Sequence, residues 1–174
     1  MSEKKPVFST RIIAEIITFV ALATALSFII VYTLPQGGSI TAGSMVPILW
    51  LALRRGPKIG FFAGAVYGTI QFLVLPYFID PIQWLLDYPL AFAILGIAGL
   101  FRKHPPIGAL FGIIGRFISA FIAGAVYWAP LYAPVVNPFV YSSIYNGSYL
   151  VPELFVSGFI IYLIQKNKIL DIYF

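Results

Sequence analysis

Long apolar stretches separated by short polar connectors limit what this chain can fold into. A helix needs about 20 apolar residues to cross roughly 30 Å of hydrocarbon. Stretches of this length occur at about 12–34, 59–79, 81–101, 106–133 and 148–165. A shorter one, at about 40–53, would form a helix of only ~21 Å. Charged residues make up 10% of the chain, against roughly a quarter in soluble domains. We therefore predict an all-α integral membrane protein with six transmembrane helices in a single domain, residues 1–174.

The positive charges predict how these helices are oriented. The connectors at 35–39, 77–80 and 134–147 contain no lysine or arginine. The alternate connectors and the two ends carry 10 of the 11 cations, namely Lys4, Lys5, Arg11, Arg54, Arg55, Lys58, Arg102, Lys103, Lys166 and Lys168. Because cytoplasmic loops are enriched in Lys and Arg, both termini are expected in the cytoplasm.

The sequence lacks residues that common enzymes and metal sites need. It has no cysteine, and its one histidine, His104, lies in a predicted cytoplasmic connector. It has no Gly-Lys dipeptide and therefore no P-loop. We predict no catalytic residues, no metal site and no cofactor. The cations are dispersed over short loops, so we expect no nucleic-acid partner. A membrane protein with a polar cavity and no energy source would act as a capture subunit for a motor supplied by other proteins.

A carboxylate interrupts the third of the long apolar stretches, in the sequence LLDYPLAF (85–92). Asp80 is followed directly by proline, which is the pattern of a helix N-cap. This start places Asp87 about 10 Å along the outer half of the helix. A charge at this depth is costly in lipid. We interpret Asp87 as a polar anchor for a ligand that enters from outside. A purely structural role, with Asp87 satisfied by Arg116 or by helix ends, is the alternative.

Three further charges lie at membrane depth. Glu15 follows Arg11 by one helical turn and is expected to pair with it. Arg116 is expected to pair with an acid or with helix carbonyls that hold the bundle together. Glu153 shares a predicted helix face with Asn146. Each of these side chains should face protein or water rather than lipid.

Two other patterns lie on the predicted outer side. The stretch 106–133 presents a face made of Gly112, Arg116, Ala120, Gly124 and Trp128. Small residues at this spacing are typical of close helix packing, and an outer tryptophan is typical of the interfacial belt. The depth of Trp128 matches that of Asp87, which favours a shared cavity. The glycine-rich loop 34–44 and the short helix after it are typical of a membrane binding site, and the loop is a candidate lid.

Four stretches match a known family: PQGGSITAGSMVPILWLALRRG (35–56), DPIQWLLDYPLAFAILGIAGLFRK (80–103), RFISAFIAGAVYW (116–128) and YSSIYNGSYLVP (141–152). They resemble the thiamine-specific substrate-binding (S) component of energy-coupling factor (ECF) vitamin transporters. The resemblance implies a six-helix S-component fold in a prokaryotic plasma membrane. It also implies a non-enzymatic subunit that captures thiamine (vitamin B1) in an outward-facing cavity. Such a subunit works with a transmembrane coupling protein and two cytoplasmic ATPases.

The resemblance also assigns roles to individual residues. An acid and the following tyrosine hold the aminopyrimidine, a tryptophan packs on the ligand, and a glycine one turn earlier gives room. We therefore predict a substrate site made of Asp87, Tyr88, Gly124, Trp128, Tyr141 and Asn146, and a lid made of Gln36, Gly37, Gly38 and Ser39. The chemistry of thiamine fits these roles, because its cationic thiazolium is attracted to an aromatic face by ~0.5–2 kcal/mol. An aminopyrimidine can also form charge-assisted hydrogen bonds with a carboxylate.

One position departs from the family. Family members carry a histidine where this chain has Ala120, so thiamine binding could be weaker or supported by another aromatic such as Tyr127. A thiamine precursor or another small vitamin-like ligand is an alternative, and a ligand-free structural subunit is a third hypothesis. Small residues on the first helix contact the coupling protein in this family. Ala21 and Ala25 are the matching candidates.

Overall fold

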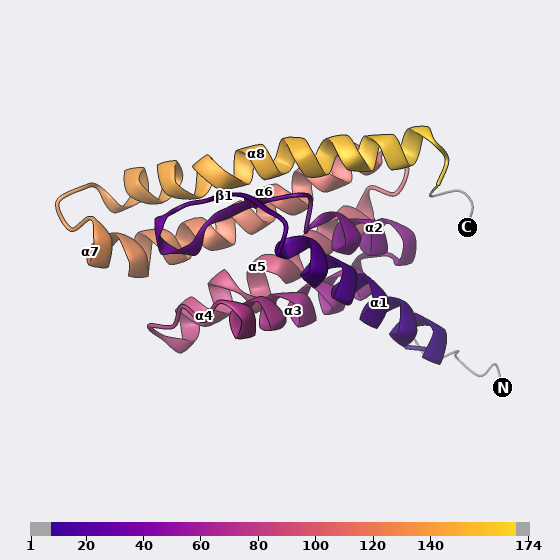
Figure 1. The fold of residues 1–174 in the computed structure, drawn as a ribbon, viewed down its shortest axis with the longest axis horizontal. Helices are drawn as coiled ribbons and strands as arrows, with labels where there is room; N and C mark the ends of the chain where they lie inside the picture. Colours follow the sequence, from indigo (N-terminus) through magenta and orange to yellow (C-terminus); the bar gives the residue numbers. More distant parts are fainter. Residues whose placement is uncertain (1–7, 170–174) are drawn as a thin grey trace.

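The chain forms an elongated bundle of helices, and the computed structural model describes residues 8–169 (Figure 1). The elements are α1 (Thr10–Ser27), β1 (Ile30–Thr33), η1 (Pro35–Gly37), β2 (Ser39–Thr41), α2 (Val46–Arg55), α3 (Pro57–Val74), α4 (Pro81–Asp87), α5 (Pro89–Ala93), η2 (Ile94–Leu100), α6 (Pro105–Ala123), η3 (Gly124–Trp128), α7 (Ala129–Tyr132) and α8 (Pro138–Lys166). The start of α1 and the end of α8 lie at one end of the bundle, opposite α7 and the start of α4. Which side of the membrane this end faces stays a prediction.

Several helical stretches are long and apolar enough to cross a membrane. Within the described residues these are Thr10–Ser27, Pro81–Leu100, Pro105–Tyr132 and Pro138–Lys166. The prediction of a helical, multi-pass membrane protein is therefore confirmed. The predicted span at 40–53 becomes α2, whose 10 residues reach only ~15 Å. The helix α3 has 18 residues and, like α2, is not one of these spanning stretches.

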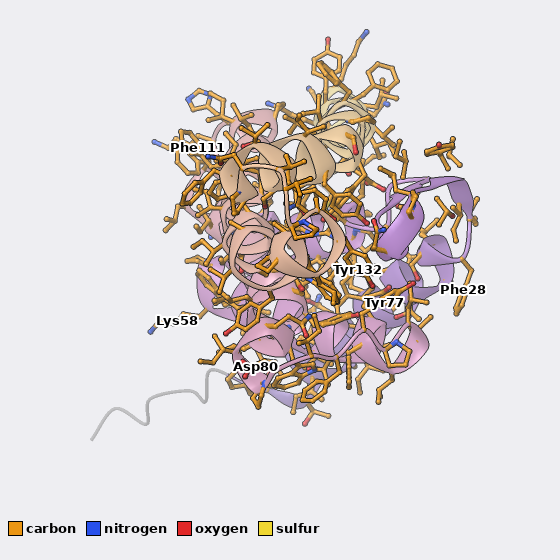
Figure 2. All side chains as sticks on the ribbon, turned by 90° about the vertical axis from the view of Figure 1, so that its left-hand side faces the viewer. Phe28, Lys58, Tyr77, Asp80, Phe111 and Tyr132 are labelled. Atoms are coloured by element: carbon orange, nitrogen blue, oxygen red, sulfur yellow. The ribbon has the colours of Figure 1, made fainter. Side chains whose placement is uncertain are left out.

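Large apolar side chains cover the outside of the bundle, as expected for a surface in contact with lipid. Ile17, Leu73 and Phe155 are examples, each more than half exposed. Figure 2 views the molecule from the end that carries α7, with Phe28 and Phe111 projecting at opposite edges of the molecule.

The prediction of one helix over 12–34 is wrong after Ser27. The helix α1 ends at Ser27, and β1 pairs antiparallel with β2 to form a hairpin. In this hairpin Ile30 lies opposite Thr41, and Thr33 lies opposite Ser39. The run IIVYT after α1 is rich in β-branched and aromatic residues, which favour an extended backbone. Hydrophobicity alone did not distinguish this run from a continuation of the helix.

A tight turn joins the two strands of the hairpin. The Leu34 N–H donates to the Gly38 carbonyl at 2.7 Å. Gln36 and Gly37 adopt positive φ angles of 64° and 88°, a region that glycine enters without steric cost. The predicted lid residues 36–39 therefore form the tip of an ordered hairpin and the first residue of β2.

The predicted helix at 81–101 starts as expected and then bends. The Asp80 side chain caps α4 by accepting the backbone N–H two residues on, at 2.7 Å. Tyr88 has φ −116° and ψ −85°, outside the helical region, and Pro89 begins α5 without an N–H to donate. The helix α3 packs against this bend. A Cβ atom on Gly68 would collide with the Tyr88 carbonyl, so this close approach requires glycine.

The last helix begins ten residues before the predicted start at 148. Asn137 caps it by accepting two backbone N–H groups at 3.0 and 3.3 Å. Pro138 occupies the first helical position, where its missing N–H costs nothing. Most of the predicted connector 134–147 is therefore helical. Tyr141 and Asn146 consequently lie on α8 itself and have fixed positions relative to one another.

The fifth predicted span, 106–133, contains a change of helix type. The helix α6 continues into η3, a π-helical turn, where the Ala129 N–H donates to the Gly124 carbonyl. This five-residue step replaces the four-residue step of an α-helix. The four-residue spacing that predicted a continuous face therefore ends at Gly124.

The predicted pair between Arg11 and Glu15 is present, with a distance of 3.4 Å between Nε and Oε1. The closer partner is Arg55 on α2, whose Nε and Nη2 donate to the two carboxylate oxygens at 2.6 and 2.5 Å. This bidentate pair joins α1 to α2.

Lys4 and Lys5, two of the cations used to predict the orientation of the helices, lie outside the described residues.

Candidate functional site

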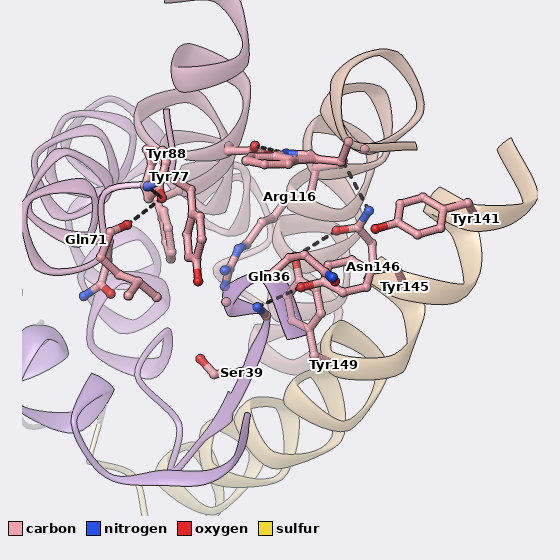
Figure 3. A pocket seen from close by; sticks show the side chains of 18 residues that line it. Gln36, Ser39, Gln71, Tyr77, Tyr88, Arg116, Tyr141, Tyr145, Asn146 and Tyr149 are labelled. Carbon is pink, nitrogen blue, oxygen red and sulfur yellow. Dashed lines mark hydrogen bonds between the residues drawn. The ribbon is translucent and has the colours of Figure 1, made fainter. Parts of the chain in front are cut away.

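A cavity opens among α3–α6, η3, α8 and the tip of the hairpin (Figure 3). All six residues of the predicted substrate site and all four predicted lid residues line it. The wall consists of Gln36, Gly37, Gly38, Ser39, Gln71, Leu75, Tyr77, Asp87, Tyr88, Phe92, Arg116, Ala120, Gly124, Trp128, Tyr141, Tyr145, Asn146 and Tyr149. The fold thus brings the predicted residues together from four separate parts of the chain. Their role in binding stays a prediction.

Asp87 is held by two donors that use the same carboxylate oxygen. Gln83 Nε2 and Trp128 Nε1 each donate to Oδ2 at 2.7 Å. Gln83 is fully buried, and its Oε1 accepts the Ile79 N–H at 3.0 Å, which fixes its orientation. Oδ1 accepts no hydrogen bond from the residues that the structure describes. Asp87 therefore enters the cavity wall with one oxygen available to a ligand.

Arg116 does not form the ion pair that the sequence suggested. The ion pairs found within residues 8–169 all involve Glu15. Instead, Arg116 Nη1 lies 2.8 Å from Met45 Sδ, and the guanidinium lies 4.0 Å from the centre of the Phe92 ring. Figure 3 shows the Arg116 side chain reaching into the cavity between Tyr77 and Tyr149. The structure therefore gives no support to a purely structural Asp87–Arg116 pair.

Tyr88 uses its hydroxyl to fix the connector between α3 and α4. It donates to the Leu75 carbonyl at 2.6 Å and accepts the Tyr77 N–H at 3.0 Å. This arrangement places the Tyr77 ring edge-on to Trp128, with 6.1 Å between ring centres. Sequence analysis did not single out Tyr77, because the PYF sequence of this connector contains no motif. Its place in the wall depends on the hydrogen bonds of Tyr88.

Gly124 and Asn146 are used in helix packing as well as in lining the cavity. A Cβ on Gly124 would collide with Ser142 Oγ on α8, so η3 and α8 approach closely there. Asn146 Nδ2 donates to the carbonyls of Ala120 and Ser142 at 3.3 and 3.0 Å. Asn146 Oδ1 accepts the Tyr149 hydroxyl at 2.9 Å. Asn146 thus joins α6 to α8 and orients Tyr149.

Three tyrosines on α8 form an aromatic wall along one side of the cavity. The Tyr141 and Tyr145 rings stack with 5.9 Å between their centres, and Tyr149 meets Tyr145 edge-on at 6.0 Å. Their spacing of four residues places them on one helix face. Tyr145 and Tyr149 were not predicted as site residues, although this spacing is visible in the sequence. The missing signal was the helical start at Pro138.

The tip of the hairpin lies against this wall. The Tyr145 hydroxyl accepts the Gly38 N–H at 2.9 Å and donates to the Pro35 carbonyl at 2.5 Å. A Cβ on Gly37 would collide with the Tyr77 ring. The predicted lid therefore contacts both sides of the cavity opening, α8 and the α3–α4 connector.

Ala120, the position at which the family resemblance led us to expect a histidine, lines the cavity. Tyr127, considered as a compensating aromatic, is not part of the described wall. The additional aromatic side chains come from Tyr77, Tyr145 and Tyr149 instead. Ala21 and Ala25, the predicted contacts with a coupling protein, are exposed on α1 and face away from the bundle.

Similarity to known proteins was found over most of the chain. A family model described as "Thiamine transporter protein (Thia_YuaJ)" matches residues 13–171. The solved structure of ThiT from Listeria monocytogenes has a TM-score of 0.80 and 27% identity, covering 90% of this chain and 93% of that chain.

Two curated relatives match shorter regions. The thiamine transporter ThiT of Bacillus subtilis is 37% identical over 87 residues, 49% of this chain and 45% of that protein. The thiamine transporter ThiT of Lacticaseibacillus paracasei is 32% identical over 93 residues, 51% of this chain and 46% of that protein. The matched part of the chain thus spans about half the length of these relatives. Because the family model covers nearly all of the sequence, the chain belongs to the thiamine transporter protein (Thia_YuaJ) family.

Proposed function

We propose that this chain is the substrate-capture subunit of an ATP-driven importer of the ECF type, and that it binds thiamine in the described cavity from outside the cell. Membership of the thiamine transporter family supports this function. The names of the two curated relatives support it further.

The observation that carries the proposal is the environment of Asp87. One carboxylate oxygen is fully engaged by Gln83 and Trp128, and the other is available at the cavity. The aminopyrimidine of thiamine offers an amine donor and a ring nitrogen that can share a proton. A ligand with this edge can form charge-assisted hydrogen bonds to Asp87 Oδ1, which are stronger than neutral ones.

The remaining wall suits the other half of thiamine. Its thiazolium carries a permanent positive charge, and an aromatic face attracts such a cation by ~0.5–2 kcal/mol. Trp128, Tyr77 and Tyr141 all line the cavity. Arg116 also lines it, with its charge placed over Phe92. We expect the thiazolium to lie on the aromatic side of the cavity, away from this guanidinium.

A second candidate ligand is a pyrimidine or thiazole precursor of thiamine. Ala120 favours this candidate, because the wall lacks the histidine that the family resemblance led us to expect there. Under this hypothesis the cavity would recognise one ring and leave the other weakly bound.

A titration with the whole ligand and with its halves tests both candidates. The purified protein in detergent would be titrated with thiamine, its phosphates, an aminopyrimidine alcohol and a hydroxyethylthiazole, with tryptophan fluorescence as the readout. We expect saturable quenching by thiamine below micromolar concentration, since Trp128 lies in the wall. Tighter binding of one precursor would favour the second candidate, and no response to any of these ligands would contradict both.

The coupling protein and the two ATPases belong to the same proposal. Ala21 and Ala25 are exposed on α1, and small side chains four residues apart allow another helix to approach closely. This surface supports docking of the transmembrane coupling protein, through which the two ATPases would drive transport.

A further inference from the structure

Glu153 is a buried acid that the cavity does not use. It lies on α8, is 2% exposed, and is not part of the cavity wall. A buried carboxylate is costly unless it is paired or hydrogen-bonded. The ion pairs found in the described part of the chain do not include it. Its hydrogen bonds must therefore account for its presence.

These hydrogen bonds go to the end of the hairpin. Glu153 Oε1 accepts the backbone N–H of Thr41, the last residue of β2. The same oxygen accepts the Thr41 hydroxyl at 2.6 Å. The Ser44 hydroxyl lies 2.9 Å from the Thr41 hydroxyl, and the Ser44 N–H donates to Thr41 Oγ1 at 3.1 Å. All three residues are buried, so these contacts are shielded from water.

The hairpin is thus attached to α8 at two points. Its tip is held by the Tyr145 hydroxyl, and its last residue is held by Glu153. Tyr145, Tyr149 and Glu153 are spaced four residues apart and share one face of α8. The two attachment points are about 12 Å apart along the helix. Two attachment points define the direction of the hairpin along α8 more firmly than the tip contact alone would.

We propose that Glu153 is a positioning residue that holds the hairpin, and with it residues 36–39, over the cavity. It acts through Thr41 and does not contact the ligand. Loss of this contact releases the end of β2, so that the tip leaves the cavity opening more often and a bound ligand escapes faster. The effect on ligand release rests on the proposed function, whereas the effect on the hairpin does not.

The two oxygens of Glu153 make a matched pair of variants possible. Only Oε1 holds Thr41, while Oε2 is buried with no hydrogen-bond partner among the described residues. Glu153→Gln keeps one side-chain oxygen as an acceptor, whereas Glu153→Leu removes both at similar size. On the other side of the contact, Thr41→Ser keeps the hydroxyl and Thr41→Val removes it.

The position of the hairpin can be measured without any ligand. The chain contains no cysteine, so Tyr32→Cys on β1 and Ile144→Cys on α8 give a unique pair of spin-label sites. Both positions are at least 60% exposed, and neither lines the cavity. We expect one narrow distance distribution in the parent, Thr41→Ser and Glu153→Gln proteins. We expect a broad or longer one in Glu153→Leu, and a smaller broadening in Thr41→Val, which keeps the backbone N–H bond to Glu153 Oε1.

Stopped-flow measurement of thiamine release from the same proteins completes the test. Release should be about tenfold faster in Thr41→Val and Glu153→Leu than in their matched controls. Unchanged distances in both variants, or release at the parent rate despite a displaced hairpin, would overturn the proposal. If Glu153→Leu does not fold, Thr41→Val and Thr41→Ser decide the outcome. If the parent protein does not bind thiamine, the proposed function fails while the distance measurement still decides the role of Glu153.

Discussion

The indole N–H of Trp128 donates to Asp87 Oδ2 at 2.7 Å and joins the π-helical turn η3 to the end of α4. The two residues are 41 positions apart in the chain and lie on different helices. The same oxygen also accepts Gln83. Asp87 therefore has a fixed orientation before any ligand arrives, which lowers the entropy that binding must overcome.

Replacing Asp87 by asparagine tests the role of its charge. Asn keeps an oxygen for Trp128 and Gln83 but loses the negative charge, so we expect thiamine affinity to fall about 10- to 100-fold. Fluorescence titration measures the affinity, and thermal unfolding in detergent measures the stability. Asp80→Asn is the matched control, because asparagine is also a good N-cap. A lower unfolding temperature of Asp87→Asn with unchanged thiamine affinity would instead favour a structural role.

Two tryptophans allow the indole hydrogen bond to be tested separately from the ring. Trp128→Phe keeps an aromatic face and removes the donor to Asp87, so we expect about a tenfold loss of thiamine affinity. Trp84 is a suitable control, because its buried Nε1 has no hydrogen-bond partner among the described residues and it does not line the cavity. Trp84→Phe should bind as the parent does. Isothermal titration calorimetry checks both variants, and equal losses would contradict the proposed contact.

Replacing each of two helical glycines by alanine should have different effects on the free energy of unfolding. Gly124→Ala places a Cβ against Ser142 Oγ, and we expect it to lower the free energy of unfolding by about 1–3 kcal/mol. Gly147 on α8 has open space around its Cα. Gly147→Ala should leave stability unchanged or raise it by up to ~1 kcal/mol, because alanine favours the helix. Thermal unfolding in the same detergent compares them, and a stable Gly124→Ala protein would show that α8 can move aside.

Larger side chains on the exposed face of α1 should separate binding from transport. We expect Ala21→Leu combined with Ala25→Leu to leave thiamine affinity unchanged, because neither residue lines the cavity. Uptake by cells that also produce the coupling protein and ATPases should fall at least about fivefold, since the added volume keeps a partner helix away. Val151→Leu, at an exposed position of α8, is the control. Normal uptake by the double variant would exclude this face as the docking surface.

The sequence was sufficient to predict where the main polar residues meet. The Asp80–Pro81 pattern set the depth of Asp87, and the structure contains that cap. The depth of Trp128 followed from its place at the outer end of the next apolar stretch. The helix start was predicted correctly because an N-cap depends on the local sequence, whereas the depth of both residues in the membrane stays a prediction.

The sequence was insufficient where tertiary contacts decide between alternatives. The apolar run after Ser27 fits either a helix or a strand, and pairing with β2 decides. The helical start at Pro138 was missed because proline and asparagine are equally typical of a loop. Arg116 was expected to pair with an acid or with helix carbonyls, whereas it contacts the Met45 sulfur and the Phe92 ring. Such contacts depend on neighbours that are distant in the sequence.

The π-helical turn makes the cavity sensitive to chain length as well as to residue type. Each residue advances a helix by roughly 100°. Deleting one residue within η3 would therefore restore α-helical spacing and rotate Trp128 about the helix axis relative to α6. The indole would then point away from Asp87, although no residue that touches the ligand had been substituted. A single-codon deletion in this turn could therefore abolish ligand recognition while leaving both flanking helices intact.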